Sequence, residues 1–156
     1  MNFKTRGFTI LEVLFSIAIL AIISLISIKS FGGEVGEKEI RAISDNVVAN
    51  IDLARSNAIT GKNGQSYGIK FGDNYFTYFT GSSYISSNES NERNDINSKF
   101  EITNDIPGAD DAIVFSKLKG DINHNGPITI TISEKSDSEN SIQLKIGKLG
   151  DVSMIE

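Results

Sequence analysis

The chain begins with an apolar run that is long enough to cross a membrane. From Phe8 to Ile28 there are 21 residues with a single charged side chain, Glu12. As a helix with a rise of about 1.5 Å per residue, this run is roughly 31 Å long, and a bilayer's hydrocarbon core is about 30 Å thick. Lys4 and Arg6 precede the run, and cations on a short leader favour a cytoplasmic N-terminus. The pattern predicts one membrane-spanning helix over residues 8–28.

A glycine-rich stretch separates this run from an amphipathic one. Gly32, Gly33 and Gly36 fall in residues 29–36, and each glycine costs a helix about 1 kcal/mol relative to alanine, which predicts a hinge or a flexible linker. From residue 37 to 60 apolar residues recur at the i, i+3 and i+4 spacings of one helix face, and Gly61 predicts the helix end. The positions on this face are Ile40, Ile43, Val47, Ile51, Ala54 and Ala58.

The remainder of the chain has the pattern of short strands joined by polar turns. Alternating, β-branched and aromatic segments predict strands at 66–71, 75–80, 99–103, 112–115, 128–133, 141–146 and 152–155. Residues 81–98 are polar and predict a long exposed loop, in which Tyr84 and Ile85 are candidate contact residues. A helix followed only by strands indicates an α+β fold, with the helix packed on an antiparallel β-sheet.

Composition and charge narrow the functional classes. Without the leader cations Lys4 and Arg6, the chain carries 13 basic residues against 20 acidic ones, so it lacks the broad positive field that binds phosphate backbones, and nucleic acid is an unlikely partner. The chain contains no cysteine, which excludes disulfides and thiolate metal sites. Residues 37–156 are enough for one modest globular domain.

Glu12 is the unusual residue of the apolar run. A carboxylate at the bilayer centre costs about 2.5–3.5 kcal/mol and is usually paired. No Lys, Arg or His lies between Phe8 and Ile28. Cleavage after Gly7 would supply a cation, because Phe8 would then carry a free α-amino group one helical turn before Glu12. A plain signal anchor whose Glu12 reaches the cytoplasmic interface is the alternative.

A known family has this combination of residues. A short basic leader that ends in Gly7, followed by Phe8-Thr9-Ile10-Leu11-Glu12-Val13-Leu14, resembles the class III prepilin signal of type IV pilins and type II secretion pseudopilins. The resemblance implies that a prepilin peptidase cleaves between Gly7 and Phe8 and methylates the N-terminus of Phe8. It further implies that Glu12 neutralises the amine of a neighbouring subunit during assembly.

This resemblance also sets expectations for architecture and location. It implies a pilin-like protein with a leader peptide at 1–7, a membrane and filament-core helix at 8–28, a hinge at 29–36 and a globular domain at 37–156. The partners would be the peptidase/methyltransferase, other pilin or pseudopilin subunits, the inner-membrane assembly platform and membrane lipid. The chain would span the inner membrane with its domain outside, and then join a filament in the periplasm or at the cell surface.

Four segments of the domain resemble the GspH/FimT family of minor pseudopilins and minor pilins more closely. These segments are residues 54–58 (Ala-Arg-Ser-Asn-Ala), Val114-Phe115, residues 128–132 and residues 146–150 (Ile-Gly-Lys-Leu-Gly). The resemblance leaves two functions open: a structural filament subunit, or a filament-tip binding module such as an adhesin or a DNA-uptake minor pilin. Binding of DNA would need a cationic patch, and Lys117, Lys119, Lys145 and Lys148 are the candidates.

The candidate chemistry of the domain is sparse. Asp121, Asn123 and Asn125 alternate ahead of Gly126 as in a calcium loop, but position twelve of that loop is Ile132 instead of glutamate. An Asx-rich turn is the preferred interpretation, and a calcium site at these three residues is the alternative. No other cofactor is expected. With a single histidine, no cysteine and no glycine-rich phosphate loop, we expect no enzymatic activity.

Overall fold

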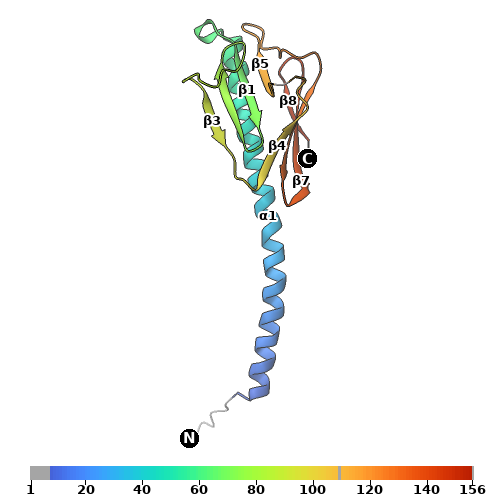
Figure 1. Ribbon diagram of the computed structural model, residues 1–156. Helices are drawn as coiled ribbons and strands as arrows, with labels where there is room; N and C mark the ends of the chain where they lie inside the picture. Colours follow the sequence, from blue (N-terminus) through green and yellow to red (C-terminus); the bar gives the residue numbers. More distant parts are fainter. Residues whose placement is uncertain (1–7, 109, 156) are drawn as a thin grey trace, which may run out of the picture. The chain divides into compact units, whose positions relative to one another are not determined.

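A computed structural model describes residues 8–108 and 110–155 (Figure 1). For residues 25–35 it describes the backbone alone. The chain divides into two compact units, Met1–Gly36 and Glu37–Glu156. All buried core residues that the structure describes lie in the second unit, from Ile40 onward.

One helix, α1, extends from Ile10 to Ile59. Residues 29–36, predicted as a hinge, have helical backbone, and the division between the two units falls at their end, after Gly36. Among the described residues, no helix is long and apolar enough to cross a membrane. The predicted span of 8–28 includes residues 25–28, whose side chains lie outside the described residues. The span and the hinge therefore stay predictions.

The second half of α1 packs on the sheets through the predicted stripe. Ile40, Val47, Ile51, Ala54 and Ala58 are buried, whereas Ile43 is half-buried. A polar residue, Ser44, is also fully buried on this face. Its hydroxyl donates to the carbonyl of Ile40 at 2.9 Å, so its polar group is satisfied within the helix and does not oppose burial. The helix ends where predicted, with Gly61 in the left-handed conformation at φ 63°.

Two four-stranded antiparallel sheets face α1, instead of the single sheet expected from the pattern. The first has the order β3-β2-β1-β5 and the second the order β4-β6-β7-β8. The bounds are β1 Tyr67–Gly72, β2 Tyr75–Thr80, β3 Glu92–Asp95, β4 Phe100–Asn104, β5 Ala112–Phe115, β6 Ile128–Glu134, β7 Asp137–Ile146 and β8 Val152–Ile155. A short 3-10 helix, η1 Lys62–Gly64, joins α1 to β1.

Most strands lie within one or two residues of the predicted ranges, with one strand unforeseen. Strand β3 falls in the segment that was predicted to be a loop. Its sequence is wholly polar, and it pairs with β2 at the edge of the first sheet. The Arg93 guanidinium lies 3.7 Å from the centre of the Tyr75 ring, a cation–π contact. Contacts with β2 therefore hold β3 in the sheet. Its sequence lacks the hydrophobic alternation that would have predicted a strand.

The first sheet is covered on both faces. Tyr67, Ile69 and Phe71 of β1 belong to the main core that α1 and the second sheet share. On the opposite face a smaller apolar cluster forms from Phe79, Ala112 and Val114, with Tyr84 packed against it. The rings of Phe79 and Tyr84 meet edge to face at 5.5 Å. The loop after β2 thus folds over the outer face of this sheet.

Candidate functional site

The start of α1 is shaped by Thr9 and Glu12. The backbone N–H of Glu12 donates to Oγ1 of Thr9 at 3.3 Å, which makes Thr9 the cap of the helix. The Thr-x-x-Glu spacing is that of a capping box. This motif is visible in the sequence, but the prediction of the helix did not include it. Glu12 also lies in the first turn, where the helix dipole favours a negative charge. Gly7 and its bond to Phe8 lie outside the described residues.

The surface of the helix over residues 8–24 is apolar and exposed. Phe8 and Ile10 are 82% and 83% exposed. Ser16 and Ser24 return their hydroxyls to the helix, donating to the carbonyls of Glu12 and Leu20 at 2.8 Å. Other large exposed side chains are Leu11, Val13, Leu14, Phe15, Ile17, Ile19, Leu20, Ile22 and Ile23. An apolar surface of this extent marks a site of contact with lipid or with another protein.

Two of the segments that suggested the closer family resemblance, residues 54–58 and 146–150, meet at the C-terminal end of α1. Nε of Arg55 donates to the carbonyl of Leu149 at 2.9 Å across 94 residues of sequence. The N–H of Leu118 donates to the carbonyl of Ala58 at 2.8 Å and so caps the helix. A Cβ at Gly150 would lie 2.7 Å from the carbonyl oxygen of Gly120, so these two loops touch through their backbones. Arg55, a half-exposed residue, thus braces the end of α1 against the loop before β8.

Asn57, on the neighbouring face of α1, holds a buried tyrosine. Its Nδ2 donates to the hydroxyl of Tyr78 at 2.9 Å, and the Tyr78 ring lies 5.9 Å from that of Tyr67. Burial raises the pKa of Tyr78 above its ordinary value of 10.0, an effect that the hydrogen bond from Asn57 partly offsets. The tyrosine therefore acts as a neutral core residue at physiological pH.

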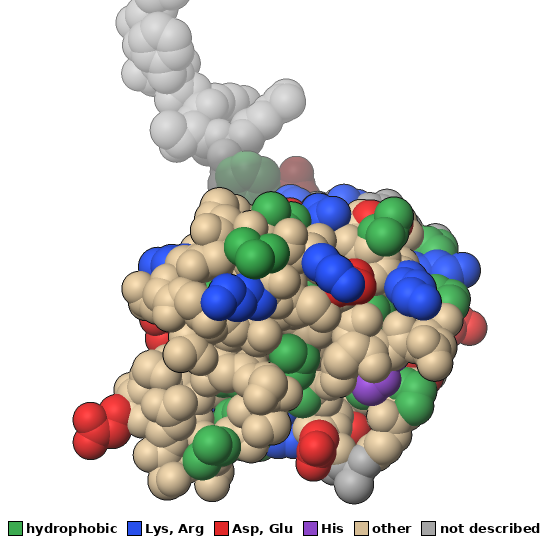
Figure 2. All heavy atoms as spheres, turned by 90° about the horizontal axis from the view of Figure 1, so that it is seen from above, with side chains coloured by type: hydrophobic (Ala, Val, Ile, Leu, Met, Phe, Trp, Pro, Cys, Tyr) green, Lys and Arg blue, Asp and Glu red, His purple; other side chains and the backbone are tan. Residues whose placement is uncertain are grey.

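The loops at the same end of the domain carry four lysines and two leucines. We call this surface the basic end; its residues are Lys62, Lys117, Leu118, Lys119, Lys148 and Leu149. Contacts join these loops, because a Cβ at Gly64 would lie 3.5 Å from Nζ of Lys117 and the N–H of Ile122 donates to the carbonyl of Lys148. Figure 2 shows Lys and Arg side chains on the face seen from above, with hydrophobic side chains among them. Of the four lysines considered from sequence, Lys145 lies apart from these loops, on strand β7.

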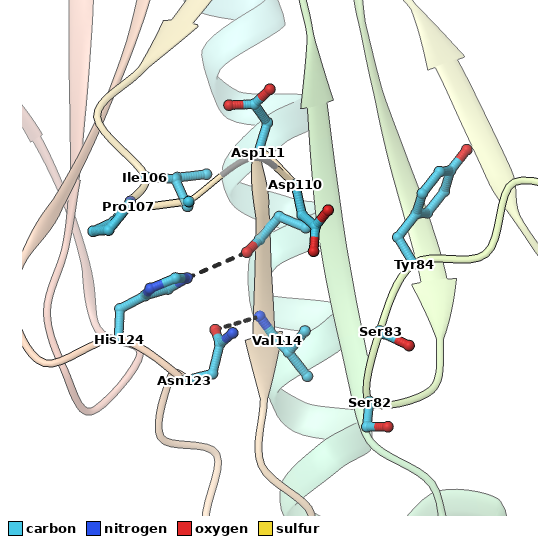
Figure 3. A pocket seen from close by; sticks show the side chains of 12 residues that line it. Ser82, Ser83, Tyr84, Ile106, Pro107, Asp110, Asp111, Val114, Asn123 and His124 are labelled. Carbon is cyan, nitrogen blue, oxygen red and sulfur yellow. Dashed lines mark hydrogen bonds between the residues drawn. The ribbon is translucent and has the colours of Figure 1, made fainter.

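A pocket of about 190 Å³ opens on the outer face of the first sheet (Figure 3). We call it the side pocket; it is lined by Ser82, Ser83, Tyr84, Ile106, Pro107, Gly108, Asp110, Asp111, Ala112, Val114, Asn123 and His124. Tyr84 stands across β1 from Asp110 and Asp111. Of the two candidate contact residues, Tyr84 thus forms a wall of the pocket, whereas Ile85 is exposed and does not line it.

The predicted Asx-rich turn, for which a calcium site was the alternative, forms the third side of this pocket. Oδ1 of Asn123 accepts the N–H of Val114 at 3.1 Å, and Nε2 of His124 lies 3.3 Å from the carbonyl oxygen of Ala112. Asn123 and His124 therefore act as a partner for the free edge of β5. Oδ1 of Asp121 is buried and, within the described part of the chain, has no hydrogen-bond partner. Calcium binding at Asp121, Asn123 and Asn125 stays an untested alternative.

Comparison with known proteins supports two parts of this description. Residues 2–28 match the family model of the prokaryotic N-terminal methylation motif. The chain is similar in structure to the minor pseudopilin EpsH from the type 2 secretion system of Vibrio cholerae, with 12% identity, a TM-score of 0.57, and coverage of 75% of this chain and 96% of that one. It is also similar to the type IV minor pilin FimU of Pseudomonas aeruginosa, with 13% identity, a TM-score of 0.61, and coverage of 76% and 90%. No curated protein sequence matches it.

These likenesses confirm the predicted fold class, a long helix packed on antiparallel strands. The chain thus combines a prokaryotic N-terminal methylation motif with a domain that is folded like those of a minor pilin and a minor pseudopilin.

Proposed function

We propose that this protein is a minor pilin or pseudopilin subunit that assembles through its N-terminal helix into a type IV pilus or a type II secretion pseudopilus. The observation that carries the proposal is the match to the N-terminal methylation motif at residues 2–28. The pilin-like fold of the rest of the chain supports it. A motif for processing and a domain suited to display on a filament are thereby joined in one chain.

The first step is cleavage between Gly7 and Phe8 and methylation of the Phe8 amine by a prepilin peptidase. The position of the helix start supports this cleavage site. Because α1 begins at Ile10 and Thr9 is its cap, a cut before Phe8 leaves the cap in place. The mature helix therefore keeps its first turn.

The new amine then requires an anion. A cation at the N-terminus of a helix faces the positive end of the helix dipole, which is unfavourable. Glu12 is the only acidic residue between Phe8 and Ile28. We propose that Glu12 neutralises the Phe8 amine of a neighbouring subunit, which also sets the register between adjacent helices.

The exposed apolar surface of residues 8–24 requires a cover both before and after assembly. Before assembly, lipid of the inner membrane would cover it, with the N-terminus in the cytoplasm and the domain outside. After assembly, the helices of other subunits would replace the lipid, with packing between helices as the driving force. The assembly platform would transfer the subunit from membrane to filament, and the hinge at 29–36 would allow the helix to bend as it packs.

Processing and assembly are tested with two substitutions and a control. Gly7→Ala is expected to block cleavage, so that the precursor keeps its first seven residues by mass spectrometry. Glu12→Ala is expected to permit cleavage but to reduce the recovery of filaments, because the amine loses its partner. Glu37→Ala removes an exposed glutamate of the globular unit and is expected to change neither step.

Two results would contradict the proposal. A mature protein that begins at a residue other than Phe8 would remove the basis for pairing the new amine with Glu12. Filaments of normal yield from Glu12→Ala, measured by shearing and immunoblotting, would show that no such pair is needed.

A further inference from the structure

Leu118 is an apolar side chain held in solvent by a strained backbone. It is 67% exposed, and its φ of 67° lies in the left-handed region, where a side chain crowds the following carbonyl oxygen. Its neighbours Lys117 and Lys119 are both exposed. Strained positions of this kind persist where the surrounding structure holds them, and they cluster at functional sites. Leu118 therefore has the character of a contact residue flanked by cations.

The side pocket has the size and lining for one aliphatic side chain. Its volume of about 190 Å³ is below the roughly 300 Å³ at which small-molecule sites begin. A cavity of about 150 Å³ nevertheless holds benzene, so a leucine side chain has room. Ile106, Pro107 and Val114 supply apolar walls, as Figure 3 shows.

Two carboxylates make this pocket complementary to the Leu118 loop in charge. Asp110 and Asp111 border it, and within the described part of the chain neither carboxylate forms an ion pair or a hydrogen bond. Lys70, which lies beside the pocket, already donates to the backbone carbonyl of Asp110 at 2.7 Å and lies 5.5 Å from the Tyr84 ring. Both carboxylates are therefore available to pair with lysines of another molecule.

We propose that Leu118 of one copy of this chain inserts into the side pocket of a second copy, with Lys117 and Lys119 facing Asp110 and Asp111. The two surfaces differ, so the contact is heterologous and can continue from copy to copy as an open chain. It adds a contact between globular domains to the helix packing proposed above. The proposed contact rests on the proposed function in one respect, which is that a filament brings copies of the chain together. The contact itself requires neither cleavage after Gly7 nor Glu12.

A second copy fits these surfaces better than a nucleic acid does. Single-stranded nucleic acids are bound largely by stacking of bases on aromatic side chains, whereas the exposed apolar residues of the basic end, Leu118 and Leu149, are aliphatic. An apolar anchor with a charged rim is the usual anatomy of a protein interface. The side pocket of a second copy supplies both parts of such an interface, because carboxylates border an apolar pocket there.

The absence of cysteine from the chain makes the contact testable by disulfide trapping. Full-length Leu118→Cys and full-length Ser83→Cys are mixed in mild detergent and oxidised, and the disulfide-linked dimer is quantified on non-reducing gels. The control pair is Leu149→Cys with Ser83→Cys, because Leu149 is 69% exposed at the same end of the domain. We expect about tenfold more dimer from the first pair, the range for a side chain central to an interface.

A charge exchange tests the rim independently. Lys117→Glu with Lys119→Glu in the Leu118→Cys chain is expected to reduce trapping by about tenfold, because like charges would then meet across the contact. Asp110→Lys in the Ser83→Cys chain is expected to restore part of it. All the changed side chains are exposed, and thermal melts of each variant check that the domain stays folded.

Four results would overturn the inference. Equal trapping by the control pair would show random collision, and a dimer formed by Leu118→Cys alone would indicate contact between identical surfaces. An amount of disulfide-linked dimer that is unchanged by the charge substitutions would show that Asp110 and Asp111 have no role in the contact. The fourth result is a gel shift of duplex DNA by the full chain, lost in the variant with Lys117→Glu and Lys119→Glu, together with no disulfide trapping. It would show that the basic end binds phosphate. Normal processing and normal Glu12 dependence beside any of these results would leave the proposed function intact.

Discussion

Gly68 lies in β1 at a position where a side chain has no room. A Cβ built there would lie against the ring of Phe79 and 2.5 Å from the carbonyl oxygen of Ile113. The backbone at Gly68 is ordinary strand, so crowding alone requires glycine. The outer cluster that supports the side pocket thus depends on the absence of one methyl group.

We therefore expect Gly68→Ala to lower the free energy of unfolding by about 1–3 kcal/mol, the usual cost of overpacking. The measurement is a urea titration followed by circular dichroism. Gly126→Ala is the matched control, because a Cβ there would meet nothing within 4 Å, and its effect should stay within about 0.5 kcal/mol. Equal stability of the two variants would show that Phe79 can move aside at little cost.

Individual residues differ in how far their sequence context reveals their role. Glu12 was conspicuous because a carboxylate in an apolar run is rare. Arg55 was not, because its acceptor is the backbone of Leu149, and a backbone carbonyl leaves no trace in residue type. Leu118 was equally hidden, since its interest lies in a left-handed φ and an exposed side chain.

At the scale of elements, α1 shows how periodicity predicts packing. The i, i+3, i+4 stripe was correct because each turn of a helix repeats the same face toward the core. Ser44 escaped the prediction since it is polar, and only its bond to the carbonyl of Ile40 permits its burial. The same helix carries Ile51 on the buried face and Leu53, 47% exposed, away from it.

This difference gives a direct test of the helix–sheet packing. Ile51→Ala is expected to lower the free energy of unfolding by about 2–5 kcal/mol, because it leaves a cavity in a fully buried site. Leu53→Ala truncates a side chain of similar size on the same helix and should cost less than about 1 kcal/mol. Thermal or urea unfolding of both variants measures the contrast. A reversed order would mean that α1 packs through another face.

The strands were predictable where their residues alternate and not where pairing alone holds them. Strands β1, β2 and β6 have β-branched or aromatic residues that mark them locally. The polar edge strand β3 has no such mark, and its register against β2 is set by cross-strand contacts such as that of Arg93 with Tyr75.

At the scale of the whole molecule, the globular unit has its own core. Every buried core residue that the structure describes lies between Ile40 and Ile146, within the unit Glu37–Glu156. A chain that starts at Glu37 is therefore expected to fold, with an unfolding midpoint close to that of the domain in the full chain. Calorimetry and near-ultraviolet circular dichroism of the two proteins test this expectation. A truncated chain without a cooperative transition would show that residues before Glu37 are part of the folding unit.

The sequence by itself determined the features that depend on neighbours a few residues apart. These are the apolar run with its single Glu12, the amphipathic stripe that follows, and most of the strands. Their signals are helix and strand periods, which any window of one or two turns contains. The match to the N-terminal methylation motif depends on the same local information, because the motif is contiguous in the sequence.

Only the tertiary structure decided which distant segments meet. The division into two sheets, the brace from Arg55 to Leu149 and the side pocket all join parts of the chain separated by tens of residues. Such contacts form because packing of the whole core selects one arrangement, and no short window records that selection. The basic end and the side pocket are therefore properties of the fold, although each of their residues is visible in the sequence.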